Sequence, residues 1–171
     1  EGVGRNTWNK GVRKYLKDHQ FSSADTNDLH AALQEAIDED FPENSLDIAQ
    51  VMSTWEDDPG FPVITVNRSG NKIILTQKVG SLHKFEDLKL YAIPVNYATS
   101  SDPNFNNKTT KLWLTTQSAE IEDFNDDWII LNIQQSGFYL VNYDDNLTDA
   151  IIEQLITNHT VIDDKSRVSF L

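Results

Sequence analysis

The chain has 171 residues and a net charge of −13, from 27 Asp and Glu against 14 Lys and Arg. This charge argues against nucleic-acid binding, because a phosphate backbone requires a basic surface. The lack of Cys excludes disulfides and thiolate sites, and no apolar run reaches the ~18 residues of a membrane span. The first residue is Glu and no signal peptide precedes it, so we expect a processed product or an excised piece.

The first third of the chain predicts three helices. Apolar residues recur at helical spacing over 8–16, 29–37 and 48–55. Gly11 lies inside the first segment and is expected to weaken that helix slightly. The run Asp-Asp-Pro-Gly at 57–60 is expected to end the third helix. Candidate helix caps precede the second and third segments: Ser22, Ser23, Asp25 and Ser45.

From Phe61 onward the apolar period changes to about two, which predicts strands. A helical period returns after Asn142. The predicted fold class is α+β, an antiparallel β-sandwich over 61–144 flanked by helical segments at 1–60 and 145–171. Both flanks have apolar faces with too few partners, so we expect them to belong to larger domains. The predicted strands are 63–67, 72–79, 90–97, 111–116, 128–133 and 137–141.

Chemistry-bearing residues form no complete catalytic constellation, so no catalytic and no metal residue is predicted. The four His residues do not have the spacing of a zinc-binding H-E-x-x-H helix. The run Ser81-Leu82-His83-Lys84 matches S-x-x-K in letters only, because it follows a strand instead of opening a helix. The carboxylate pairs at 126–127 and 144–145 are interpreted as solvated turns. The four His are His19, His30, His83 and His159.

Acidic residues are concentrated over 101–150, which hold nine Asp and Glu but only two Lys. A solvated surface is the favoured interpretation, and a calcium or cationic-partner site is the alternative. Asp102, Asn104 and Asn106 imitate the start of a calcium loop, but its Gly and its final Glu are missing. Glycosylation of Asn-Xaa-Ser/Thr sequences would imply a secretory route, and the candidates are Asn67, Asn107, Asn146 and Asn158.

Seven short strings follow one another along the chain: G-V-R-K-Y-L at 11–16, D-L at 28–29, V-M-S-T-W at 51–55, G-F-P-V-I at 60–64, W-I-I-L-N at 128–132, G-F-Y at 137–139 and V-N-Y-D at 141–144. In this order they resemble the zinc-dependent aminopeptidase N family of gluzincins, and they are most similar to its insect midgut members. The resemblance covers nearly the whole chain. Leu140 stands where the family usually has Arg, so any ion pair of that Arg is lost.

The resemblance implies that 1–60 ends a catalytic domain, 61–144 is a β-sandwich domain and 145–171 begins a C-terminal helical domain. The family's zinc ligands and catalytic residues lie upstream of such a segment. The implied cofactors are therefore none in this chain and zinc in the parent enzyme. Residues expected at the domain junctions are Trp55, Phe61, Pro62, Tyr139, Val141 and Tyr143.

The expected function is that of a non-catalytic spacer fragment of a cell-surface zinc metallo-aminopeptidase, which removes N-terminal amino acids from peptides. Its expected partners are the rest of the parent enzyme and, for the parent, peptide substrates. The expected location is the extracellular face of the plasma membrane, with the parent anchored and this fragment soluble. One alternative is a receptor surface for a bacterial pore-forming toxin through the polar loop 99–110, and another is a sugar- or calcium-binding sandwich unrelated to peptidases.

Overall fold

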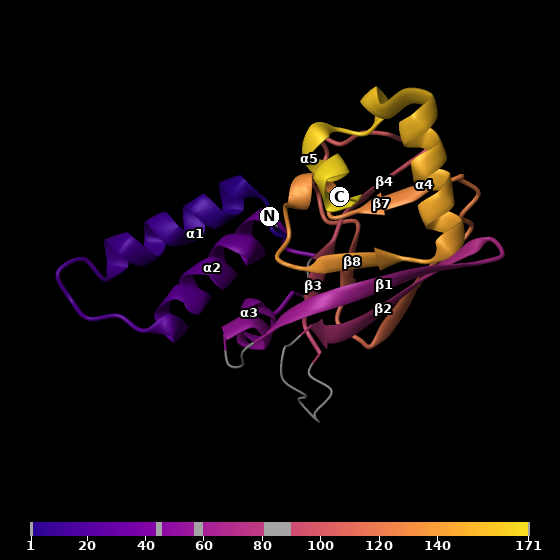
Figure 1. Cartoon of the computed structure of the whole chain (residues 1–171). Helices are drawn as coiled ribbons and strands as arrows, with labels where there is room; N and C mark the ends of the chain where they lie inside the picture. Colours follow the sequence, from indigo (N-terminus) through magenta and orange to yellow (C-terminus); the bar gives the residue numbers. More distant parts are fainter. Residues whose placement is uncertain (1, 44–45, 57–59, 81–89, 171) are drawn as a thin grey trace. The chain divides into compact units, whose positions relative to one another are not determined.

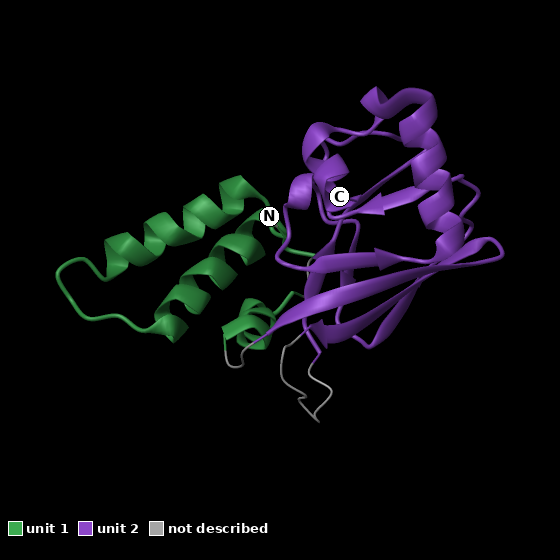
Figure 2. Cartoon of the chain, viewed as in Figure 1, with its two compact units in different colours: residues 1–59 green, residues 60–171 purple. Residues whose placement is uncertain are grey.

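The computed structural model describes residues 2–43, 46–56, 60–80 and 90–170 (Figure 1). The chain divides into two compact units, residues 1–59 and 60–171 (Figure 2). The described elements of the first unit are helices, and the second unit holds the strands together with the C-terminal helices. Within the described ranges, no helix combines the length and the apolarity needed to cross a lipid bilayer.

The first unit contains three helices, as the helical spacing predicts: α1 (Arg5–Asp18), α2 (Thr26–Asp40) and α3 (Ile48–Glu56). Leu33 and Ile37 of α2 form its core with Ile48 of α3. Among the predicted caps, Asp25 is confirmed as the N-cap of α2. Ser45 and residues 57–59 of the predicted stop at 57–60 lie outside the described residues.

α1 approaches α2 closely at Gly11. A Cβ at this position would lie 2.8 Å from Cδ2 and 2.9 Å from Cα of Leu33. The buried residues of α1 are Thr7 and Gly11, whereas Trp8 and Leu16 of the predicted apolar stripe are 38 % and 62 % exposed. The glycine therefore allows tight helix packing, which the helical period alone did not indicate.

The second unit contains eight strands among its described residues, and most predicted strands are found with shifted ends. The predicted strand 90–97 is instead two strands, because the chain changes partner at Asn96. One strand absent from the prediction is β6, which has only four residues and none that is buried. The strands are β1 (Phe61–Ser69), β2 (Lys72–Gly80), β3 (Ile93–Val95), β4 (Tyr97–Thr99), β5 (Leu112–Leu114), β6 (Ser118–Ile121), β7 (Ile129–Leu131) and β8 (Leu140–Tyr143).

The strands pair in one four-stranded sheet of order β6-β2-β1-β8 and two two-stranded sheets, β3-β5 and β4-β7. Figure 1 shows β8 beside the long strand β1. All pairings are antiparallel, as predicted, except that β8 runs parallel to β1, with Val63 opposite Leu140. The predicted all-antiparallel arrangement is therefore wrong at this pair, and the structure as a whole is mixed α and β.

Helix α4 (Asp145–Asn158) shares a core with the strands. Ile151 of α4 packs with Trp128 and Ile130, and the chain returns to the same cluster at Ile162. Asp144 caps α4 by accepting a hydrogen bond from the Leu147 N–H at 2.8 Å, and its other oxygen accepts one from the Arg68 N–H. The remaining short helices are η1 (Ile133–Gln135), η2 (His159–Val161), α5 (Asp164–Arg167) and η3 (Val168–Phe170).

Candidate interaction site beside strand β8

An apolar hollow of about 570 Å³ lies beside β8 in the second unit. We call it the β8 hollow. Three separate parts of the unit contribute to it: the start of β1, the segment that leads into β8, and η3 near the end of the chain. Its apolar lining residues include Phe61, Phe138, Leu140, Val141 and Val168.

Side chains alternate between the two faces of the chain as it enters β8. Phe138 and Leu140 are 76 % and 58 % exposed, whereas Tyr139 between them is 5 % exposed. β8 is also an edge strand of its sheet. An edge strand next to exposed apolar side chains is a surface suited to receiving another polypeptide segment. The β8 hollow is therefore the candidate interaction site of this chain.

Two asparagines hold the segment before β8 in place. The Asn132 side chain donates hydrogen bonds to the carbonyl oxygens of Gly137, at 3.1 Å, and Tyr139, at 2.9 Å, and accepts one from the Gly137 N–H at 2.7 Å. Asn96 accepts a hydrogen bond from the Ile133 N–H at 2.8 Å. These bonds occupy backbone groups that a strand would need, which explains why the predicted strand 137–141 begins only at Leu140.

Tyr139 and Tyr143 point into the unit and not toward the exposed side of the hollow. The Tyr143 hydroxyl accepts a hydrogen bond from the Leu131 N–H at 2.9 Å. Burial raises the pKa of both tyrosines above the ordinary value, so both phenols stay neutral at physiological pH. Their chemistry is that of internal packing. Phe138 and Leu140 carry the exposed apolar surface. The sequence singled out Leu140 only because it replaces the family's Arg, and it did not single out Phe138. The strand alternation around Tyr139 was the signal for their exposure.

The other residues expected at domain junctions lie in several environments. Pro62 is buried in β1, while Phe61 and Val141 are half-buried and help to line the β8 hollow. Trp55 is half-buried in α3 of the first unit. Their role at domain boundaries stays a prediction.

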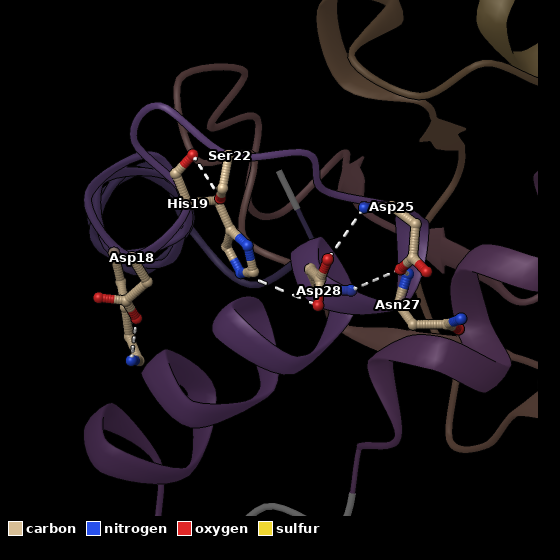
Figure 3. A network of polar contacts seen from close by, with 7 residues as sticks. Asp18, His19, Ser22, Asp25, Asn27 and Asp28 are labelled. Atoms are coloured by element: carbon tan, nitrogen blue, oxygen red, sulfur yellow. Dashed lines mark hydrogen bonds and ion pairs between the residues drawn. The ribbon is translucent and has the colours of Figure 1, made fainter.

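A Ser–His–Asp grouping lies where the turn after α1 meets the first turn of α2 (Figure 3). Nε2 of His19 lies 3.8 Å from an oxygen of Asp28. The Ser22 hydroxyl donates to the backbone carbonyl of His19, at 3.1 Å, and not to its ring. A nucleophilic serine needs its hydroxyl against a base, so this geometry is that of a turn and not of a catalytic triad. Asp28 instead completes the capping box of α2 by accepting from the Asp25 N–H at 2.9 Å.

The remaining candidate groups serve structural contacts where they are described. His30 Nε2 lies 3.5 Å from Glu56, and His159 Nδ1 lies 2.6 Å from the Arg167 guanidinium. His83 and the S-x-x-K match at 81–84 lie outside the described residues. Within the described ranges, no group of three or more His, Asp or Glu could hold a metal ion.

The acidic stretch supplies hydrogen bonds and ion pairs at several separate places. Lys72 bridges Glu120 and Glu122 at 2.9 and 2.8 Å. Asp126 accepts hydrogen bonds from the Ser100 hydroxyl and the Ser101 N–H, at 3.0 and 2.7 Å. Glu120 lies in β6, Glu122 directly follows it, and Asp126 lies in the loop before β7, so these carboxylates join neighbouring segments of the chain at separate places.

Comparison with known proteins gives relatives of much greater length. The chain is 34 % identical to aminopeptidase N of Rattus norvegicus over 162 residues, 90 % of this chain and 16 % of that protein. It is 30 % identical to the membrane alanyl aminopeptidase of Heliothis virescens over 162 residues, 88 % of this chain and 16 % of that protein. It is 32 % identical to tricorn protease-interacting factor F2 of Thermoplasma acidophilum over 151 residues, 88 % of this chain and 17 % of that protein. No family model matches the chain.

Two of these three relatives are named as aminopeptidases. The chain is homologous to the aminopeptidase N family over about nine-tenths of its length, which confirms the family that its sequence resembles. It spans only one-sixth to one-fifth of the length of the relatives reported in the comparison, since 16 to 20 % of each is covered.

Proposed function

We propose that this chain is a non-catalytic spacer segment of a zinc metallo-aminopeptidase. The proposal rests on how much of each protein the similarity covers. It extends over 90 % of this chain but only 16 % of rat aminopeptidase N. The described residues do not fit a zinc site, because they provide no group of His, Asp and Glu that could hold a metal. Zinc, peptide substrates and the removal of N-terminal amino acids are therefore assigned to the whole protein.

The β8 hollow supports a connecting role. Its exposed Phe138 and Leu140 would be an unfavourable surface in water, and covering them with other parts of the polypeptide would remove that apolar area from solvent. In this proposal the strands form a β-sandwich between a catalytic and a C-terminal helical domain. The relatives' names, which include a membrane alanyl aminopeptidase and an ectoenzyme, support placing the whole protein at the cell surface.

The proposal predicts that the isolated chain hydrolyses no amino-acid anilide and binds no stoichiometric zinc. Anilide hydrolysis is followed by absorbance, and zinc is measured by elemental analysis after dialysis. Rat aminopeptidase N, assayed alongside, is the positive control for both measurements. Hydrolysis by the chain that disappears with a chelator would contradict the non-catalytic assignment.

A second candidate is a binding surface for a protein partner such as a bacterial pore-forming toxin. The loop 99–110 supports it, because Phe105 is 5 % exposed and lies 6.4 Å from the Trp128 ring centre, while its neighbours are exposed. Because buried Phe105 holds the loop in place, Asn104 and Asn106 lie at fixed positions on the surface. Fixed loops at the surface commonly carry binding residues.

This candidate predicts that the double substitution Asn104→Ala and Asn106→Ala weakens capture by immobilised toxin about tenfold, which corresponds to roughly 1.4 kcal/mol. Phe105 is left in place, because its removal would disturb the core. Asn125→Ala, at another exposed asparagine, is the matched control. Equal capture of the double variant and the control would remove this loop as the binding surface.

A further inference from the structure

The four Asn-Xaa-Ser/Thr sequences occupy different backbone conformations. Asn67 lies in β1, and Asn146 lies in the first turn of α4. Asn107 lies in the loop 99–110, and Asn158 lies where α4 passes into η2. The distinction matters because an N-linked sugar is bulky and must extend from the side-chain amide into solvent.

Asn107 is exposed at a turn that is held from the interior. Its Oδ1 accepts a hydrogen bond from the Thr109 N–H at 3.1 Å. Beneath it, the Asn96 side chain donates to the Lys108 carbonyl at 3.3 Å, and Phe105 is buried. Because Oδ1 is directed back to the chain, the amide nitrogen on the other side of the planar group is directed away from this bond.

Asn158 has the same arrangement, but it makes two hydrogen bonds to the Thr two residues later instead of one. Its Oδ1 accepts hydrogen bonds from both the N–H and the hydroxyl of Thr160, at 3.2 and 2.7 Å. Asn158 is exposed. In both turns, therefore, the Thr that completes the Asn-Xaa-Thr sequence lies against the asparagine side chain.

At Asn67 and Asn146, regular secondary structure separates the asparagine side chain from the Ser or Thr two residues later. In a strand, residues two apart are about 6.6 Å apart along the chain, and in a helix they do not face each other. Asn67 is also half-buried and pairs with Ile74 of β2. Asn146 lines a polar hollow with Arg68 and Asp127.

We propose that Asn107 and Asn158 are N-glycan acceptors and that Asn67 and Asn146 are not. The inference rests on the cell-surface location in the proposed function. The donor is an oligosaccharide linked to a lipid through pyrophosphate. The Nδ2 lone pair of the asparagine forms the bond to the first sugar carbon, and the bond from that carbon to the pyrophosphate oxygen breaks. Nδ2 loses one proton, and the lipid pyrophosphate is the leaving group.

The experiment is secretion of the chain from insect cells behind an added signal peptide. Peptide N-glycosidase in heavy-oxygen water converts each glycosylated Asn to labelled Asp, which peptide mass spectrometry locates. We expect label at Asn107 and Asn158, with Asn67 and Asn146 unchanged. Asn107→Gln and Asn158→Gln should each remove one glycan from the intact mass, whereas the matched control Asn106→Gln, exposed but outside the motif, should remove none.

Occupancy of Asn67 or Asn146 equal to that of Asn107 would overturn the proposal, and so would an unmodified Asn107 or Asn158 in secreted protein with native circular dichroism. Because the signal peptide imposes the secretory route, either result leaves the spacer function untouched. The spacer function is tested separately, by anilide hydrolysis and zinc content of the unglycosylated chain.

Discussion

Replacing Ile151 by alanine should lower the free energy of unfolding of the second unit by about 3 kcal/mol. Ile151 of α4 is fully buried, and it packs in one cluster with Trp128, Ile130 and Ile162. The truncation removes apolar contacts and leaves a cavity between a helix and strands, which cannot close without moving both. Urea unfolding followed by tryptophan fluorescence measures the loss, because Trp128 lies in the affected cluster.

The neighbouring Ile152 provides the matched control. It is on the same helix with the same side chain, but it is 47 % exposed. Ile152→Ala should cost less than about 1 kcal/mol, because most of its surface is already in water. Equal losses for the two variants would contradict the packing of α4 against the strands.

Asn132→Ala should destabilise the second unit by about 3 kcal/mol, since buried backbone groups would lose their hydrogen-bond partners. Asn132 is 9 % exposed and makes three hydrogen bonds to Gly137 and Tyr139. It also has a φ of 57°, which asparagine tolerates better than alanine. The same variant should loosen the wall of the β8 hollow, which amide hydrogen exchange over 137–141 would detect.

Two further substitutions separate the causes at Asn132. Asn132→Gly removes the hydrogen bonds but accepts the positive φ, so it should be about 1 kcal/mol more stable than the alanine variant. Asn132→Asp keeps an acceptor for the Gly137 N–H and loses the two donated bonds. Wild-type stability of the alanine variant would show that the side chain does not hold this segment.

The helices of the first unit could be predicted because their signals are local. The apolar spacing over 29–37 predicts α2, and its cap depends on Asp25 and Asp28, three residues apart. The face that α1 buries could not be predicted in the same way. Thr7 and Gly11 are buried because α2 approaches the glycine closely, and the position of α2 is not contained in the sequence of α1.

The strands show the same division. Alternation predicts that β1 and β2 exist, but the break at Asn96 and the parallel pairing of β8 depend on partners distant in the sequence. Gln77 is another example. It is 2 % exposed, and its side chain bonds the Tyr91 N–H and carbonyl at 2.9 and 3.0 Å and the Thr116 carbonyl at 2.8 Å. A polar residue in a strand pattern does not by itself indicate such a buried role.

For the candidate site, the sequence alone determined the resemblance to the aminopeptidase N family and drew attention to 137–143. Only the tertiary structure decided that Phe138 and Leu140 are exposed while Tyr139 and Tyr143 pack inward. The physical reason is that alternation defines two faces without saying which one is buried. That choice is made by the core cluster of Trp128, Ile130 and Ile151, against which Tyr143 packs, and by the Asn132 hydrogen bonds at the start of β8.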